Sequence, residues 1–128
     1  MHRIRALIAT ALVASAILAV PSPAMAKAGD VVRAGNCSGA ADWKLKVSPD
    51  NGRWEVEFQV DTNRVGRTWR VRIYDNGVLR LTTLRTTTAP SGAFTVRRLV
   101  PNMAGTDTVV VRARNVTSGQ LCVGKVTV

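Results

Sequence analysis

Two neighbouring runs indicate the fold class: Trp43-Lys44-Leu45-Lys46-Val47 and, after a short break, Trp54-Glu55-Val56-Glu57-Phe58-Gln59-Val60-Asp61. In both runs apolar and polar side chains alternate, which is the pattern of a β-strand with one buried and one solvated face. Between them lies Asn51-Gly52, the type of dipeptide that most strongly favours a tight hairpin turn. The segment therefore predicts two antiparallel strands, with Lys44 and Lys46 across from Glu55 and Glu57 on the outer face.

The same alternation continues along the chain. Further strands are expected within residues 68–74, 79–81, 94–96, 109–113 and 121–128, separated by turns that contain Gly or Pro. Asn76-Gly77 repeats the hairpin signal. About seven short strands in a domain of this size predict an all-β fold, a single antiparallel β-sandwich of the immunoglobulin-like type, with a barrel as the main alternative.

The first 26 residues have the three parts of a secretory signal peptide. Arg3 and Arg5 form a basic start, residues 6–20 are uncharged and mostly apolar, and Ala24-Met25-Ala26 offers a cleavage site between small residues. The apolar run is about 15 residues long, shorter than the roughly 20 that span a bilayer. We therefore expect cleavage after Ala26, a mature domain of residues 27–128 without a membrane span, and a secreted, extracellular location.

Composition limits the classes of function. The chain has 128 residues, 18 Lys and Arg against 8 Asp and Glu, and a hydrophobic fraction of 46% that suffices for a folded core. Loss of the signal peptide removes Arg3 and Arg5, so that 16 basic against 8 acidic residues leave the mature domain with a net charge of +8. A charge of this size bears on solubility and on acidic or polyanionic partners.

The two cysteines, Cys37 and Cys122, lie near the two ends of the mature domain. In an oxidising exterior, an even number of cysteines is most simply explained by a disulfide. A metal or redox role lacks support, because the pair has no CxxC spacing and the mature domain has no histidine. We expect the bond to tie the first strand, or the loop beside it, to the last strand.

The candidate binding site is a set of arginines on neighbouring predicted strands: Arg70, Arg72, Arg80 and Arg85. Several of them are expected to share one outward face. Such a face could bind an anionic cell-envelope polymer or an acidic protein, whereas the simpler interpretation is a solvated surface that keeps the protein soluble. Nucleic acid is disfavoured, because the outward positions offer few aromatic side chains for base stacking.

Catalysis has little support in the residue set. The mature domain has no histidine and no G-x-S-x-G motif, and Glu55 and Glu57 have expected lysine partners. The tryptophans occupy the apolar positions of their strands and are predicted to pack in the core: Trp43, Trp54 and Trp69. We therefore expect a non-enzymatic protein with no cofactor and no metal. The alternative function is a secreted protease inhibitor acting through an exposed loop from Thr86 to Gly92.

Three short segments carry a resemblance: the signal peptide, Asn36-Cys37-Ser38-Gly39 ahead of Trp43-Lys44-Leu45-Lys46, and Gly119-Gln120-Leu121-Cys122. Through them the chain resembles small secreted actinobacterial proteins of unassigned function. The resemblance implies an immunoglobulin-like or fibronectin-like β-sandwich and implies no activity. Enediyne apoproteins and secreted subtilisin inhibitors are similar in size but carry two disulfides, whereas this chain has cysteines for one. The oligomeric state stays open.

Overall fold

The structure is a computed structural model that describes residues 29–128. The expected signal peptide at residues 1–26 lies outside the described residues. The described chain is all-β and has eight strands: β1 (Val31–Asn36), β2 (Asp42–Asp50), β3 (Arg53–Asp61), β4 (Thr68–Asp75), β5 (Val78–Thr86), β6 (Ala93–Pro101), β7 (Thr108–Asn115) and β8 (Leu121–Thr127). Within residues 29–128, no helix is long and apolar enough to cross a membrane.

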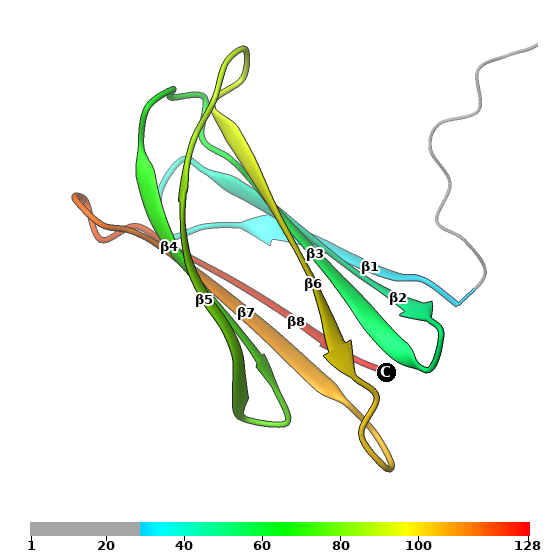
Figure 1. Ribbon diagram of the computed structural model, residues 1–128. Coiled ribbons are helices and arrows are strands. Elements are labelled where there is room, and N and C mark those ends of the chain that lie inside the picture. Colours follow the sequence, from blue (N-terminus) through cyan, green and yellow to red (C-terminus); the bar gives the residue numbers. More distant parts are fainter. Residues whose placement is uncertain (1–28) are drawn as a thin grey trace, which may run out of the picture.

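The strands form two antiparallel sheets of four strands each. The first sheet has the order β1-β2-β3-β6 and the second sheet the order β5-β4-β7-β8. The two sheets are stacked as layers (Figure 1), so the predicted sandwich is confirmed and the barrel alternative is wrong. Apart from β1, the arrangement of β2-β3-β6 against β5-β4-β7-β8 is the strand order of an immunoglobulin-like sandwich.

The strand that the sequence does not predict is β1, which makes eight strands rather than about seven. Its sequence, VVRAGN, lacks the alternation that marks the other strands. It forms by pairing along the whole of its length with β2, from Val31 opposite Val47 to Asn36 opposite Asp42. Gly35 permits this pairing, because a Cβ at that position would lie only 2.8 Å from the ring of Trp43.

Two tight hairpins fix the register within both sheets. The turn between β2 and β3 is Asn51-Gly52, with φ of 48° and 77°, and the turn between β4 and β5 is Asn76-Gly77, with φ of 49° and 79°. Positive φ at both central residues defines a type I′ turn, whose twist matches that of the flanking strands. Both predicted hairpins are therefore confirmed.

Charged side chains on the outer face of the first sheet only partly follow the prediction. Lys46 lies opposite Glu57, and their side chains form an ion pair at 3.7 Å. Arg97 on β6 reaches the same carboxylate at 3.4 Å. Lys44, however, lies opposite Gln59, so one expected lysine–glutamate pair is wrong. The two-residue turn closes the hairpin in a register that offsets the lysines from the glutamates by two positions.

The core consists of inward-pointing side chains from both sheets. Trp69 is buried, and its ring centroid lies 6.2 Å from that of Phe94. Trp43 stacks on Phe58, with 5.9 Å between the ring centroids. Trp43 and Trp54 are half-buried and pack against the buried cluster. The prediction that all three tryptophans belong to the core is confirmed.

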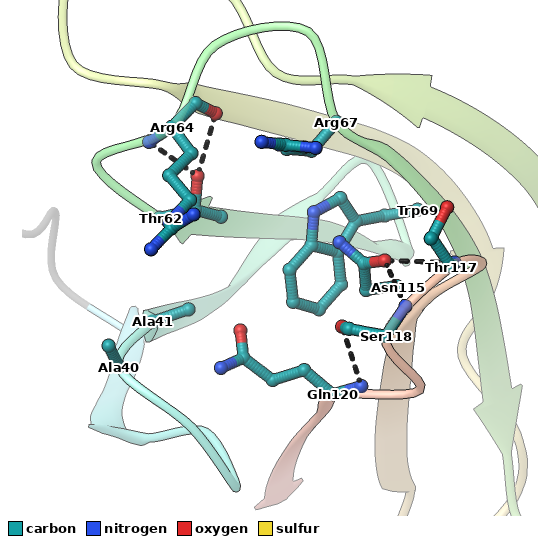
Figure 2. A pocket seen from close by; sticks show the side chains of 10 residues that line it. All are labelled: Ala40, Ala41, Thr62, Arg64, Arg67, Trp69, Asn115, Thr117, Ser118 and Gln120. Carbon is teal, nitrogen blue, oxygen red and sulfur yellow. Dashed lines mark hydrogen bonds between the residues drawn. The ribbon is translucent and has the colours of Figure 1, made fainter.

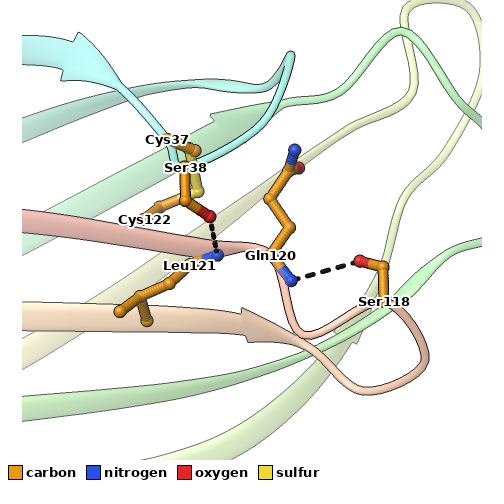
Figure 3. The surroundings of a disulfide bond; sticks show 6 residues. All are labelled: Cys37, Ser38, Ser118, Gln120, Leu121 and Cys122. Carbon is orange, nitrogen blue, oxygen red and sulfur yellow. Dashed lines mark hydrogen bonds between the residues drawn. A yellow bond between two sulfur atoms is a disulfide. The ribbon is translucent and has the colours of Figure 1, made fainter.

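A disulfide joins one edge of the first sheet to one edge of the second. Cys37, in the connection after β1, is bonded to Cys122 on β8, and their Cα atoms are 4.3 Å apart (Figure 3). The backbone N–H of Ser38 donates to the carbonyl of Leu121 at 2.8 Å, and the Leu121 N–H donates to Ser38 Oγ at 2.9 Å. The predicted bond between the start of the domain and its last strand is confirmed.

Replacing both cysteines with alanine measures how much this bond stabilises the domain. The bond links residues 85 positions apart, for which the loss of loop entropy in the unfolded chain corresponds to roughly 4–5 kcal/mol. We expect Cys37→Ala/Cys122→Ala to lose about that much unfolding free energy in urea, and reduced wild-type protein to match it. A loss below about 1 kcal/mol would contradict this expectation, because the bond would then restrict the unfolded chain far less than the loop-entropy model requires.

Candidate functional site

The two sheets differ strongly in charge. The strands of the first sheet hold six basic residues, Arg33, Lys44, Lys46, Arg53, Arg97 and Arg98, and five acidic ones, Asp42, Asp50, Glu55, Glu57 and Asp61. The strands of the second sheet hold seven basic residues: Arg70, Arg72, Arg80, Arg85, Arg112, Arg114 and Lys125. Their one acidic residue, Asp75, is buried. The excess positive charge is therefore concentrated on the second sheet.

Four of these arginines form a two-by-two group on the outer side of the second sheet. The pairing of β4 with β7 places Arg70 opposite Arg114 and Arg72 opposite Arg112. Val71, between the two arginines of β4, points into the core, so by the pleat of the strand its neighbours point outward. All four arginines are exposed. We call the surface formed by Arg70, Arg72, Arg112 and Arg114 the basic face.

The basic face concentrates positive charge that no carboxylate of residues 29–128 neutralises in an ion pair. Side chains directly opposite each other have Cβ atoms about 4.5–5.5 Å apart, and alternate residues of one strand are about 7 Å apart. The ion pairs of Glu57 with Lys46 and Arg97 lie on the first sheet. Like charges placed directly opposite destabilise a sheet. A bound anion would relieve this repulsion and could accept paired hydrogen bonds from the guanidinium groups.

Apolar side chains border the basic face on both sides. Leu84 on β5 lies opposite Arg70, and Val123 on β8 lies opposite Arg112. Their exposed fractions are 53% and 40%, which is high for apolar side chains of this size. Lys125 adds a further exposed positive charge on β8. The surface can therefore contact both the charged groups and the uncharged segments of a chain-like ligand.

Two of the four predicted site residues lie elsewhere. Arg80 is the extra residue of a β-bulge in β5, at the point where the pairing with β4 passes from Ile73 to Tyr74. This bulge breaks the alternation that would have turned Arg80 outward. The side chain of Arg80 is half-buried, and its Nη2 donates to the sulfur of Met103 at 3.4 Å. Arg85 lies opposite Trp69, on the inward side of β5, and is exposed because β5 is an edge strand. The expected shared face is therefore wrong for Arg80 and Arg85.

The structure does bring Arg70 and Arg72 together, and it adds two residues that the sequence did not single out. Arg112 and Arg114 alternate with buried residues of β7 just as Arg70 and Arg72 do in β4. That alternation is visible in the sequence and could have marked them as outward-facing. The pairing of β4 with β7 joins segments about 40 residues apart, and no local pattern specifies such a pairing.

The loop at residues 86–92, the alternative candidate, is held against the connection between β3 and β4. Thr87 is buried, its N–H donates to the carbonyl of Arg67 at 2.8 Å, and its carbonyl accepts from the N–H of Gly66 at 2.8 Å. The loop then closes on itself, because the N–H of Gly92 donates to the carbonyl of Thr88 at 2.9 Å. Its exposed part is therefore a closed turn rather than an extended segment.

Two carboxyl groups meet in the interior at the opposite end of the sandwich. Asp75, at the end of β4, and Asp107, just before β7, are both buried. Asp107 accepts from Trp54 Nε1 at 2.8 Å and from the N–H of Met103 at 3.2 Å, whereas no donor in the described chain reaches either carboxylate oxygen of Asp75. Burial raises the pKa of Asp75 to about 6, and Asp107 adds to the rise, both as acceptor for the protonated carboxyl and through its charge. The charge of Arg80 opposes the rise.

This carboxyl pair was not predicted, because both residues stand beside turn residues in the sequence. Among residues 29–128, no group of three His, Cys, Asp or Glu side chains is placed to hold a metal ion. Comparison of the chain with protein-family models, with curated proteins and with solved structures gives no match. The distribution of charge over the two sheets is therefore the main indication of function.

The raised pKa of Asp75 makes stability depend on pH. Because the folded-state pKa lies above the ordinary value of 3.8, the folded protein keeps a proton that the unfolded chain has released. This contribution to stability is fully present below about pH 4 and is lost as the pH rises to about 6. Asp75→Asn cannot titrate, so its stability relative to wild type should rise by roughly 2 kcal/mol from pH 4 to pH 7.

Urea unfolding of both proteins at the two pH values measures this difference. Asp42→Asn, which changes an exposed aspartate, is the matched control and should show no comparable trend. If the difference between Asp75→Asn and wild type were the same at pH 4 and pH 7, Asp75 would not titrate between them and the described environment of its carboxyl group would be wrong.

Proposed function

We propose that the protein is exported and acts without catalysis, by binding an anionic polymer of the cell envelope through the basic face. The observation that carries this proposal is the two-by-two group of exposed arginines, which lies on a sheet without an exposed acidic residue. Arginine suits this role, because its planar guanidinium donates two parallel hydrogen bonds to a phosphate or carboxylate group.

Clustering distinguishes this proposal from the simpler solubility interpretation. A surface that serves only solubility works with scattered charges of both signs, as on the first sheet. On the second sheet, Arg70–Arg114 and Arg72–Arg112 are like-charged cross-strand pairs, which cost stability in the free protein. Neutralising such a cluster with a polyanion releases counterions, so binding gains affinity as the salt concentration falls.

Location outside the cell also has support. The disulfide between Cys37 and Cys122 fits an oxidising compartment, as expected for an extracellular protein. The export signal expected at residues 1–26 would deliver the domain there. The protease-inhibitor alternative has less support, because the exposed part of residues 86–92 is a closed turn. An acidic protein remains the alternative partner for the basic face.

Retention on isolated cell wall, with and without its anionic polymers, tests the proposal. Protein produced from the full chain, with the disulfide formed, is applied at roughly 50 mM and 300 mM salt, a range over which phosphate contacts weaken strongly. We expect retention that needs the polymers and falls at least tenfold at the higher salt. Lack of retention at low salt would contradict the proposal and favour an acidic protein as the partner.

A matched pair of variants shows whether the basic face, rather than net charge, is responsible. One variant replaces the basic face with glutamine: Arg70→Gln, Arg72→Gln, Arg112→Gln and Arg114→Gln. The control removes the same charge elsewhere: Lys44→Gln, Arg53→Gln, Arg85→Gln and Arg98→Gln. The first should lose most of its retention at 50 mM salt, and the control should keep most of it.

Stability measurements separate loss of binding from loss of folding. Removing like-charged neighbours should leave the unfolding free energy of the basic-face variant unchanged or raise it by up to about 1 kcal/mol. Equal loss of retention in the two variants would contradict the basic face as the binding surface, since it would reduce the effect to net charge.

A further inference from the structure

A cavity of about 300 Å³ lies at the end of the sandwich formed by the β1–β2, β3–β4 and β7–β8 connections. Trp69 and Asn115, which are cross-strand partners on the inner side of the second sheet, both line it (Figure 2). Arg70 and Arg114, the next pair along these strands, point outward to the basic face. The cavity and the basic face therefore lie on opposite sides of the same sheet.

Among residues 29–128, the indole N–H of Trp69 finds no acceptor, although the side chain is only 1% exposed. Buried tryptophan N–H groups normally have a hydrogen-bond partner. Trp54 follows this rule, since its Nε1 donates to Asp107 at 2.8 Å. Trp69 lines the cavity, so this unpaired N–H belongs to a residue of the cavity wall.

Two side-chain amides turn further donors to the cavity. The carboxamide of Gln120 fits its surroundings when its oxygen accepts from the N–H groups of Gly39 at 3.2 Å and Ala40 at 2.9 Å, which leaves its amino group for the cavity. The oxygen of Asn115 accepts from two backbone N–H groups of the β7–β8 connection, both at 2.9 Å. Its amide nitrogen lies on the side of the Trp69 indole (Figure 2).

Two arginines give the cavity its charge. Arg64 and Arg67, from the connection between β3 and β4, line it, and no carboxylate of the described part of the chain is among the lining residues. The backbone of Arg64 is held in place, because Thr62 Oγ1 accepts from its N–H at 3.0 Å and Thr87 Oγ1 donates to its carbonyl. Gly92 packs so closely against the backbone of Arg64 that a Cβ at position 92 would lie 2.3 Å from the backbone nitrogen of Arg64. The loop that presents the guanidinium groups is therefore well anchored.

We infer that this cavity binds a small oxyanion, whose carboxylate or phosphate oxygens accept from Trp69 Nε1, from the amides and from the two guanidinium groups. Donors without a competing carboxylate favour an acceptor-only, negatively charged ligand. The volume is at the lower end of the range for small-molecule sites, which points to a small molecule rather than a polymer. Ala40 and Ala41 offer an apolar wall for the rest of the ligand. This site is separate from the proposed function of the basic face.

The N–H signals of the indole rings in a ¹H–¹⁵N NMR spectrum report on the site directly. The chain has three tryptophans, and Trp69→Phe identifies the Trp69 signal by its disappearance. Disulfide-bonded protein from the full chain is titrated at constant ionic strength and pH 7 with inorganic phosphate in one series and with succinate in another. We expect the Trp69 signal to shift and saturate in at least one series, while the Trp54 signal, engaged with Asp107, stays in place.

Single charge removals test the role of the arginines. Arg64→Gln and Arg67→Gln should each weaken the affinity about ten- to a hundredfold, the usual effect of losing a hydrogen bond to a charged group. Arg53→Gln, on the turn end of β3, removes the same charge and should leave the affinity unchanged. The glutamine variant of the basic face should also bind as wild type does, so failure of one proposal does not imply failure of the other.

Saturation with phosphate alone, or with succinate alone, would support the inference and identify the oxyanion. A Trp69 signal that does not move up to about 50 mM of either anion would overturn it, leaving water as the occupant of the cavity. Equal weakening by Arg53→Gln and Arg64→Gln would also overturn it, because the effect would then come from the net charge of the domain.

Discussion

The pairing of β4 with β7 is the constraint on which the other features depend. It buries Val71 opposite Ala113 and, with the same register, places the arginines of the basic face opposite one another on the outside. Because side chains alternate along each strand, a slip of one residue would bury those guanidinium groups and expose the core residues. The core therefore fixes the arrangement of the charges. The same two strands position Trp69 beside the cavity at one end and lead to the Asp75–Asp107 pair at the other.

Local pattern predicted the parts of the molecule that depend on a few neighbouring residues. Period-two alternation predicted the sandwich and the outward positions of Arg70 and Arg72, and the two Asn-Gly dipeptides predicted the hairpins. The rest depends on tertiary contacts. β1 becomes a strand through its neighbour, Arg80 is displaced by a bulge, and the cavity is assembled from connections far apart in the chain. The partner strand of β4 is likewise selected by the packing of the whole sandwich.

The distribution of charge over the two sheets has a physical cost, which the proposed binding of a polyanion would offset. Acidic residues balance the basic ones on the first sheet, where Lys46 and Arg97 share Glu57. On the second sheet, no carboxylate of residues 29–128 forms an ion pair with the four arginines of the basic face, which destabilises the free protein and favours any state in which an anion lies on that face. The hydrophobic core and the disulfide at the β1–β8 edge supply stability that tolerates this repulsion. Solubility alone would not require the charges to be gathered in cross-strand pairs.

We propose that the basic face is the surface of the domain that contacts the polymer. Mapping by NMR tests it most directly, with purified teichoic acid added to ¹⁵N-labelled protein and the backbone and arginine Nε–H signals followed. We expect the largest shifts at β4 and β7, including Arg70, Arg72, Arg112 and Arg114, and we expect these shifts to reverse as salt is added. Shifts spread evenly over both sheets, or centred on the outer face of the first sheet, would contradict it.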